Sequence, residues 1–150
     1  MITAGGVPTP LATSVGAATA ANILNGFQSF AATTGATTLL TVPAGRTWVG
    51  VVGVSCTASV AAASSTAGQA RCVVATAGAN VTPAAGTVVA CEAKAGANAA
   101  TGTVGSNAAQ RASVPVTVIA PAGNAVTLTV VTTQAGTASV IDAWAVGALV

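Results

Sequence analysis

The alternation of side chains along residues 48–60 restricts this chain to a β fold more strongly than any other feature of its sequence. One parity is largely apolar, whereas the other mixes valines with hydroxyl side chains. The apolar set is Trp48, Val52, Val54, Cys56, Ala58 and Val60, and the mixed set is Val49, Val51, Ser55, Thr57 and Ser59. A period of two predicts a strand of an antiparallel sheet with one face in the core. Trp48 is expected to anchor that core.

A Pro-Ala-Gly sequence occurs twice, at 43–45 and at 121–123, and each copy joins an apolar segment to a longer one. Proline presets φ at the second position of a turn, and glycine accepts the left-handed conformation at the turn's exit. We therefore predict that the two copies form equivalent corners of two hairpins.

Five further segments have the length and pattern of strands, namely 71–76, 87–94, 111–120, 125–133 and 137–146. In 125–133 the apolar parity is Val126, Leu128 and Val130, which alternate with Thr127 and Thr129. Pro115 predicts an edge position or a bulge, because proline cannot donate to a ladder. In the last segment, Val140, Trp144 and Val146 share one parity and are predicted to face the core. Asp142 has the same parity, so we expect a partly buried, hydrogen-bonded acid or a residue at the rim of the sheet.

The whole pattern predicts an all-β protein, an antiparallel β-sandwich over 37–150, with jelly-roll and immunoglobulin-like topologies both open. Residues 1–36 are predicted to form an N-terminal arm, extended or weakly helical. The larger side chains of this arm need a surface to cover, so we predict that the arm lies on a neighbouring subunit or on the chain's own domain. Arg46, at the first corner, is a further candidate for a contact with a partner's carboxylate. The predicted contacts in the arm are Val7, Pro8, Pro10, Leu11, Ile23, Leu24, Phe27 and Phe30.

Charged side chains are rare: four Lys or Arg and two Asp or Glu in 150 residues, with a net charge of +2. This charge is too small and too scattered for nucleic-acid binding. A monomer with so few charges tends to self-associate, which predicts that partner chains cover much of the surface. No apolar run reaches the roughly 18 residues of a membrane span. The first residues lack the basic region of a signal peptide, so synthesis and folding in the cytosol are expected.

The three cysteines, Cys56, Cys72 and Cys91, are interpreted as small buried apolar residues, with a cross-strand Cys72–Cys91 bridge as the alternative. The chain contains no histidine, which argues against a zinc site and against an activated nucleophile. Glu92 and Asp142 are the only carboxylate pair in the side chains and have ordinary interpretations as surface or rim residues. We therefore expect no enzymatic activity, no metal and no cofactor.

The sequences TVPAGRTWVG at 41–50 and APAGNAVTLTV at 120–130 resemble small β-rich structural proteins of tailed phages and prophages from high-GC hosts. The resemblance covers 37–149. It implies a virion component assembled in the host cytoplasm, most simply a capsid decoration protein. Its partners would be the major capsid protein or other virion subunits, and a homo-oligomer, with a trimer favoured, is expected. The alternative is a receptor- or carbohydrate-binding module of a tail fibre or minor tail protein. Sugar sites favour exposed aromatic side chains, and the two candidates, Trp48 and Trp144, are both expected in the core. A surface adhesin is a third alternative.

Overall fold

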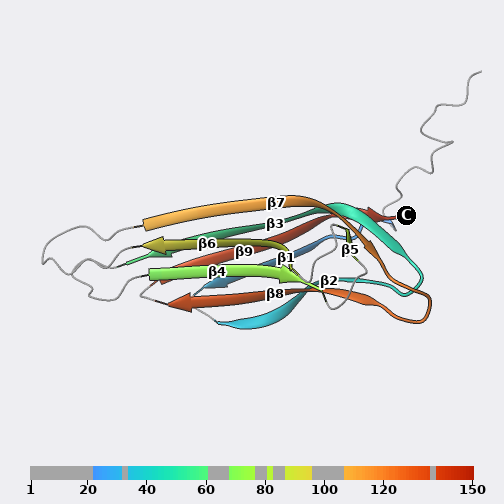
Figure 1. The fold of residues 1–150 in the computed structure, drawn as a ribbon, viewed down its shortest axis with the longest axis horizontal. Helices are drawn as coiled ribbons and strands as arrows, with labels where there is room; N and C mark the ends of the chain where they lie inside the picture. Colours follow the sequence, from blue (N-terminus) through green and yellow to red (C-terminus); the bar gives the residue numbers. More distant parts are fainter. Residues whose placement is uncertain are drawn as a thin grey trace, which may run out of the picture.

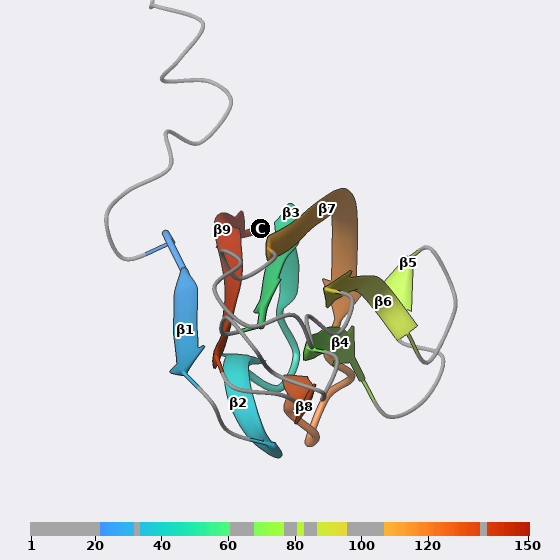
Figure 2. The ribbon, with the colours of Figure 1, turned by 90° about the vertical axis from the view of Figure 1, so that its left-hand side faces the viewer.

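The computed structural model describes residues 22–31, 34–60, 68–76, 81–82, 87–95, 107–135 and 138–150, and these parts contain strands and turns (Figure 1). The strands are β1 (Gly26–Ala31), β2 (Gly35–Val42), β3 (Thr47–Ser59), β4 (Gly68–Ala75), β5 (Val81–Thr82), β6 (Thr87–Ala95), β7 (Asn107–Ile119), β8 (Val126–Ala135) and β9 (Ala138–Leu149). They form two antiparallel sheets packed face to face (Figure 2). The predicted all-β sandwich is confirmed.

The order of strands is β1-β9-β3-β7-β5 in one sheet and β2-β8-β4-β6 in the other. When the two-residue β5 is left out, the pairs β1·β9, β2·β8, β3·β7 and β4·β6 are nested, as in one long hairpin. The contacts β9·β3 and β8·β4 then roll this hairpin into a sandwich. Eight strands with this double Greek-key connectivity make a jelly roll. The choice that the sequence leaves between jelly-roll and immunoglobulin-like topologies is thereby decided.

The two Pro-Ala-Gly sequences form the corners where the hairpin passes from one sheet to the other, between β2 and β3 and between β7 and β8. Each is a turn closed by a hydrogen bond, from Arg46 N to Pro43 O (3.2 Å) and from Asn124 N to Pro121 O (3.1 Å). Proline is thus the first residue of each turn, not the second as predicted, and the glycine occupies the left-handed position, with φ of 72° and 88°.

The predicted equivalence of the two corners extends to direct contact between them. Gly45 N donates to Pro121 O at 3.0 Å, and Ala120 N donates to Arg46 O at 2.9 Å. Both corners lie at the right-hand end of Figure 1. Since these bonds join two of the connections between the sheets, they fix one end of the sandwich.

The core between the sheets consists mainly of valine, alanine and leucine around Trp48, which is fully buried. The predicted core positions of β3 and β8 are confirmed, because their side chains are almost fully shielded from solvent. The Trp48 ring lies against Gly50 and Gly147, where an added Cβ would come within 2.5 and 2.7 Å of ring atoms. Its Nε1 donates to the Leu24 carbonyl at 2.8 Å. The ring therefore fills a space that only glycine neighbours leave open.

The predicted orientation of β9 is wrong. Ile141, Ala143 and Ala145 face the core, whereas Trp144 is half-buried and Val146 is exposed on the outer face. The two-residue period of this strand was predicted correctly, but the face that it turns to the core was not, because Ile141 and two alanines point inward while Trp144 and two valines point outward. Asp142 is half-buried and accepts a hydrogen bond, as expected.

The chain before residue 37 takes part in the sandwich as far as the structure describes it. β1 pairs along β9 from Gly26↔Ala145 to Ala31↔Val140 and forms an edge of the five-stranded sheet. Upstream, Leu24 N donates to Gly147 O and Leu149 N donates to Asn22 O, at 3.0 and 2.7 Å. Residues 26–31 are therefore extended, while 1–21 lie outside the described residues.

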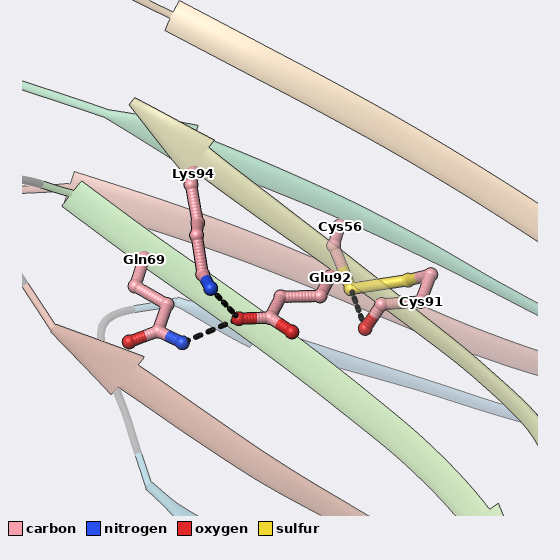
Figure 3. A network of polar contacts seen from close by, with 5 residues as sticks. All are labelled: Cys56, Gln69, Cys91, Glu92 and Lys94. Carbon is pink, nitrogen blue, oxygen red and sulfur yellow. Dashed lines mark hydrogen bonds and ion pairs between the residues drawn. A yellow bond between two sulfur atoms is a disulfide. The ribbon is translucent and has the colours of Figure 1, made fainter. Parts of the chain in front are cut away.

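The interpretation of all three cysteines as unbridged residues is wrong, and so is the alternative pairing. A disulfide joins Cys56 on β3 to Cys91 on β6, linking the two sheets, and Cys72 is a buried free thiol. Cys72 is the cross-strand neighbour of Cys91, as the alternative assumed. However, Cys91 is bonded across the core instead (Figure 3).

Candidate functional site

The outer faces of the two sheets differ in polarity. Among the described residues, the large apolar side chains that remain exposed belong to the five-stranded sheet or to chain bonded to it, with the single exception of Val131 on β8. Ile23 forms a bridge to Ala148, and Val150 N donates to Thr47 O, so both extend this sheet. The set is Ile23, Phe27, Val49, Val51, Ile119, Val140, Val146 and Val150. Contiguous exposed apolar surface of this kind marks an interaction site.

The strand register gathers the centre of this surface into one patch. Val51 on β3 lies directly opposite Val146 on β9 and opposite Pro115 on β7. Trp144, two residues before Val146, is the cross-strand partner of Phe27 on β1. We call this patch the apolar band, and it consists of Phe27, Val49, Val51, Pro115, Trp144 and Val146.

Trp144 is held flat on the sheet within the apolar band. Its ring lies against Gly53 of β3, where an added Cβ would overlap the Cζ2 and Cε2 atoms of the indole. The guanidinium carbon of Arg111 is 5.8 Å from the ring centroid, within the range of a cation–π contact. The missing side chain at Gly53 therefore lets the indole cross β3 toward β7, with an arginine beside it.

A polar row crosses the sheet next to the apolar band. Ser55 on β3 has Asp142 of β9 on one side and Arg111 of β7 on the other, as direct cross-strand partners. Ser29 of β1 continues the row and donates its hydroxyl to Asp142 Oδ1 at 2.6 Å. The face thus carries one positive and one negative group on the two sides of β3.

The outer face of the four-stranded sheet is polar and contains an ion pair (Figure 3). Glu92 Oε1 accepts from Lys94 Nζ at 2.9 Å and from Gln69 Nε2 at 2.6 Å. These two contacts, with Lys94 first, lower the pKa of the exposed Glu92 carboxyl below its ordinary value of 4.5. Charges on β6, the edge strand of this sheet, disfavour pairing with another chain. This face has the character of a surface in contact with water.

The structure separates the predicted contact residues into three groups. Ile23 and Phe27 are exposed, Phe27 to 65% at the margin of the apolar band, and Arg46 is exposed at the first corner. Leu24 and Phe30 instead pack against the core. Four further predicted contacts, Val7, Pro8, Pro10 and Leu11, lie outside the described residues.

The titratable groups of the described residues are dispersed. Glu92 lies on the outer face of one sheet and Asp142 on that of the other, so the two carboxylates cannot flank one glycosidic bond. Within the described ranges, no cluster of His, Cys, Asp or Glu is arranged to hold a metal ion. No helix suited to crossing a membrane is found in them either.

Sequence reasoning missed the centre of this surface, because it assigned Trp144 and Val146 to the core. A signal was present: the charged Asp142 shares their parity, and an acid is more easily accommodated on an outer face than in a core. Phe27 was selected only as part of the arm, not as the partner of Trp144.

A scan against protein-family models gives no match to this chain, and a search of curated proteins finds no similar sequence.

Proposed function

We propose that this chain is a non-enzymatic structural protein of a phage virion, most simply a capsid decoration protein that binds the assembled shell. The observation that carries the proposal is the contrast between the two outer faces: one is charged, and the other presents the apolar band. A chain with six charged side chains and such a band is suited to packing against other subunits. The partners are further copies of the chain and the major capsid protein or another virion subunit.

The fold and the disulfide support this role. Jelly rolls are common in viral capsids, and they also occur in lectins, so this support is an analogy at the level of the fold. Disulfides persist on virion surfaces and in other oxidising surroundings, and the Cys56–Cys91 bridge suits exposure outside the host cell. The resemblance noted from the sequence adds the expectation of a homo-oligomer, with a trimer favoured.

A decoration protein stabilises a shell by mass action, because it binds the assembled state and not the free subunits. Val7, Pro8, Pro10, Leu11 and Arg46 remain the predicted contacts with the shell. With few charges available, such contacts rest on apolar side chains and on main-chain hydrogen bonds, as in strand addition.

Heating particles with and without the protein tests the proposal. We expect particles that carry the protein to lose their genome at a higher temperature than bare particles. Leu11→Asp, in the predicted contact set, should reduce this protection. Val131→Asp, which adds the same charge to the outer face of the four-stranded sheet, should not. Equal stability of decorated and bare particles contradicts the stabilising role.

A second candidate function is a carbohydrate- or receptor-binding module of a tail fibre. It is favoured by the position of Trp144 outside the core, beside the polar groups of Arg111 and Asp142. Flat aromatic rings with polar neighbours suit sugar stacking, although here one side of the ring is covered by Gly53. A glycan array decides: binding that is lost in Trp144→Ala supports this candidate, and an array without binding removes it.

A further inference from the structure

We propose that the outer face of the five-stranded sheet pairs with the same face of a second copy, about a two-fold axis parallel to β3. In this pair Arg111 of each copy lies against Asp142 of the other. The inference deepens the proposed structural role, on which it rests, by naming the occupant of the apolar band. It makes the homo-oligomer a dimer, in place of the trimer that the resemblance favours. It leaves the shell contact to the predicted residues of the arm and the first corner.

The positions of the two charges select both the occupant and the axis. Asp142 on β9 and Arg111 on β7 are partners of the same residue, Ser55, so they lie in one row on either side of β3. They are about 10 Å apart, at two strand spacings of about 4.8 Å. A two-fold axis along β3 exchanges the β9 side with the β7 side and keeps each row in place. It therefore sets each carboxylate opposite a guanidinium, twice in every pair.

An axis across the strands offers no such pairing. Through the row of Ser55 it would leave β9 facing β9 and would set Asp142 against Asp142 and Arg111 against Arg111. Through any other row it would set both charged groups against uncharged side chains. Like charges placed opposite one another at an interface are strongly unfavourable. The face also has no net charge among its described side chains, since these two groups balance. It is complementary to itself, as an isologous interface must be.

Apolar side chains meet across the same axis. The row shared by β9 and β7 sets Val146 against Pro115 of the other copy, and Val51, on β3, lies on the axis and meets its own equivalent. The Trp144 ring lies over Gly53 of β3, so the indoles of the two copies also meet at the axis.

The area of the face corresponds to a weak pair. The rows from Val49 to Thr57 span about 31 Å along β3, and the three strands that overlap in the pair, β9, β3 and β7, span about 14 Å, or about 440 Å² per copy. A specific stable interface buries about 1,200–2,000 Å² in total, and weaker, transient ones bury less. Pairing of aligned sheets at a small angle is also the ordinary way in which twisted sheets pack.

Sedimentation equilibrium on the isolated full-length protein tests the pairing, and a complementation experiment makes the test specific. Arg111→Asp gives each copy two acids in the row, and Asp142→Arg gives each copy two arginines. Each variant alone should dimerise at least about 100-fold more weakly than the wild type. An equimolar mixture should form a mixed dimer, because every facing pair is then of opposite sign. Misfolding cannot produce this recovery.

Two valine variants provide a matched control, because Val51 and Val131 are both 43% exposed and lie on opposite sheets. Val51→Asp places two carboxylates face to face on the axis and should abolish the dimer, whereas Val131→Asp should leave it intact. Circular dichroism checks that both variants are folded.

A wild type that stays monomeric or forms a trimer overturns the pairing, as does a mixture of the charge variants that fails to dimerise. The particle-heating experiment reports separately on the proposed function. A monomer that still protects particles would refute this inference and leave the decoration role in place. A dimer that gives no protection to particles would support the pairing and contradict the decoration role.

Discussion

Removing the bridge between the sheets should destabilise the fold by an amount that follows from its position in the chain. Cys56 and Cys91 are 35 residues apart, and closing a loop of that length lowers the entropy of the unfolded chain by an equivalent of about 4 kcal/mol at 25 °C. Domains of this kind are stabilised by only about 5–15 kcal/mol in total. Cys91→Ala should therefore lose a large part of the free energy of unfolding.

The position of Cys72 makes a sharper comparison available. Cys72 and Cys91 are direct antiparallel partners, whose Cα atoms lie within the span that a disulfide accepts. If Cys56→Ala is refolded under oxidising conditions, Cys72 and Cys91 should bridge, closing a loop of about 19 residues worth about 3 kcal/mol. Cys56→Ala and Cys91→Ala each remove one buried sulfur, but only Cys91→Ala leaves no two cysteines opposite each other on neighbouring strands. Cys91→Ala should be the less stable by about 3 kcal/mol.

Urea unfolding with and without a reducing agent measures these differences, and peptide mapping identifies the bridge in each variant. Reduction should lower the free energy of unfolding of the wild type by about 4 kcal/mol and leave that of Cys91→Ala unchanged. Once reduced, Cys56→Ala and Cys91→Ala should be equally stable. Cys72→Ala, the control, should keep the native bridge and lose about 1 kcal/mol. Burial raises the pKa of the Cys72 thiol to about 11, so the native bridge should not rearrange at neutral pH. A wild type that is insensitive to reduction would refute the reasoning.

Three further outcomes can be measured on the isolated protein. Trp48→Phe leaves the Leu24 carbonyl without its donor and should cost about 1–3 kcal/mol in urea unfolding; an unchanged midpoint contradicts this. Gly53→Ala puts a Cβ where the Trp144 ring lies and should cost about 1–3 kcal/mol and alter the tryptophan fluorescence; an unaltered spectrum means that the ring is not held there. The pKa of Glu92 is lowered in the folded state, so its contribution to stability is present above pH 4.5 and disappears as the pH falls through the folded pKa. Glu92→Gln should remove this part of the acid dependence of Tm, and identical profiles would argue against it.

Local patterns in the sequence were sufficient to predict much of this fold. The alternation along β3 and β8 identified the core positions, and the repeated Pro-Ala-Gly identified both corners. β1 was missed because Gly26–Ala31 pairs only with β9, more than a hundred residues away, and has little alternation of its own. The disulfide was missed for the same physical reason. Which partner Cys91 takes depends on the packing of β3 over β6, and spacing along the chain does not contain that information.

The candidate site could be predicted only in part, because the side that a strand turns to the core depends on the space available there. The inward positions of β9 include Gly147, against which the Trp48 ring already lies. An inward Trp144 would compete with it for a core built otherwise from valine and alanine. The rule that larger apolar residues face inward therefore failed at β9, while it held at β3.

Asp142 explains why β9 keeps Val140, Trp144 and Val146 on the outside. A shift of one residue along a strand reverses both of its faces. In β9 such a shift would bury Val140, Trp144 and Val146, and the burial of these apolar side chains taken alone would be favourable. It would also carry the Asp142 carboxylate into the core, where an unpaired charge costs far more than the added apolar area returns. In the present register that carboxylate keeps the Ser29 hydroxyl as a donor. One acid thus holds an apolar surface outward, which is a net cost to an isolated molecule and becomes favourable once a second surface covers it.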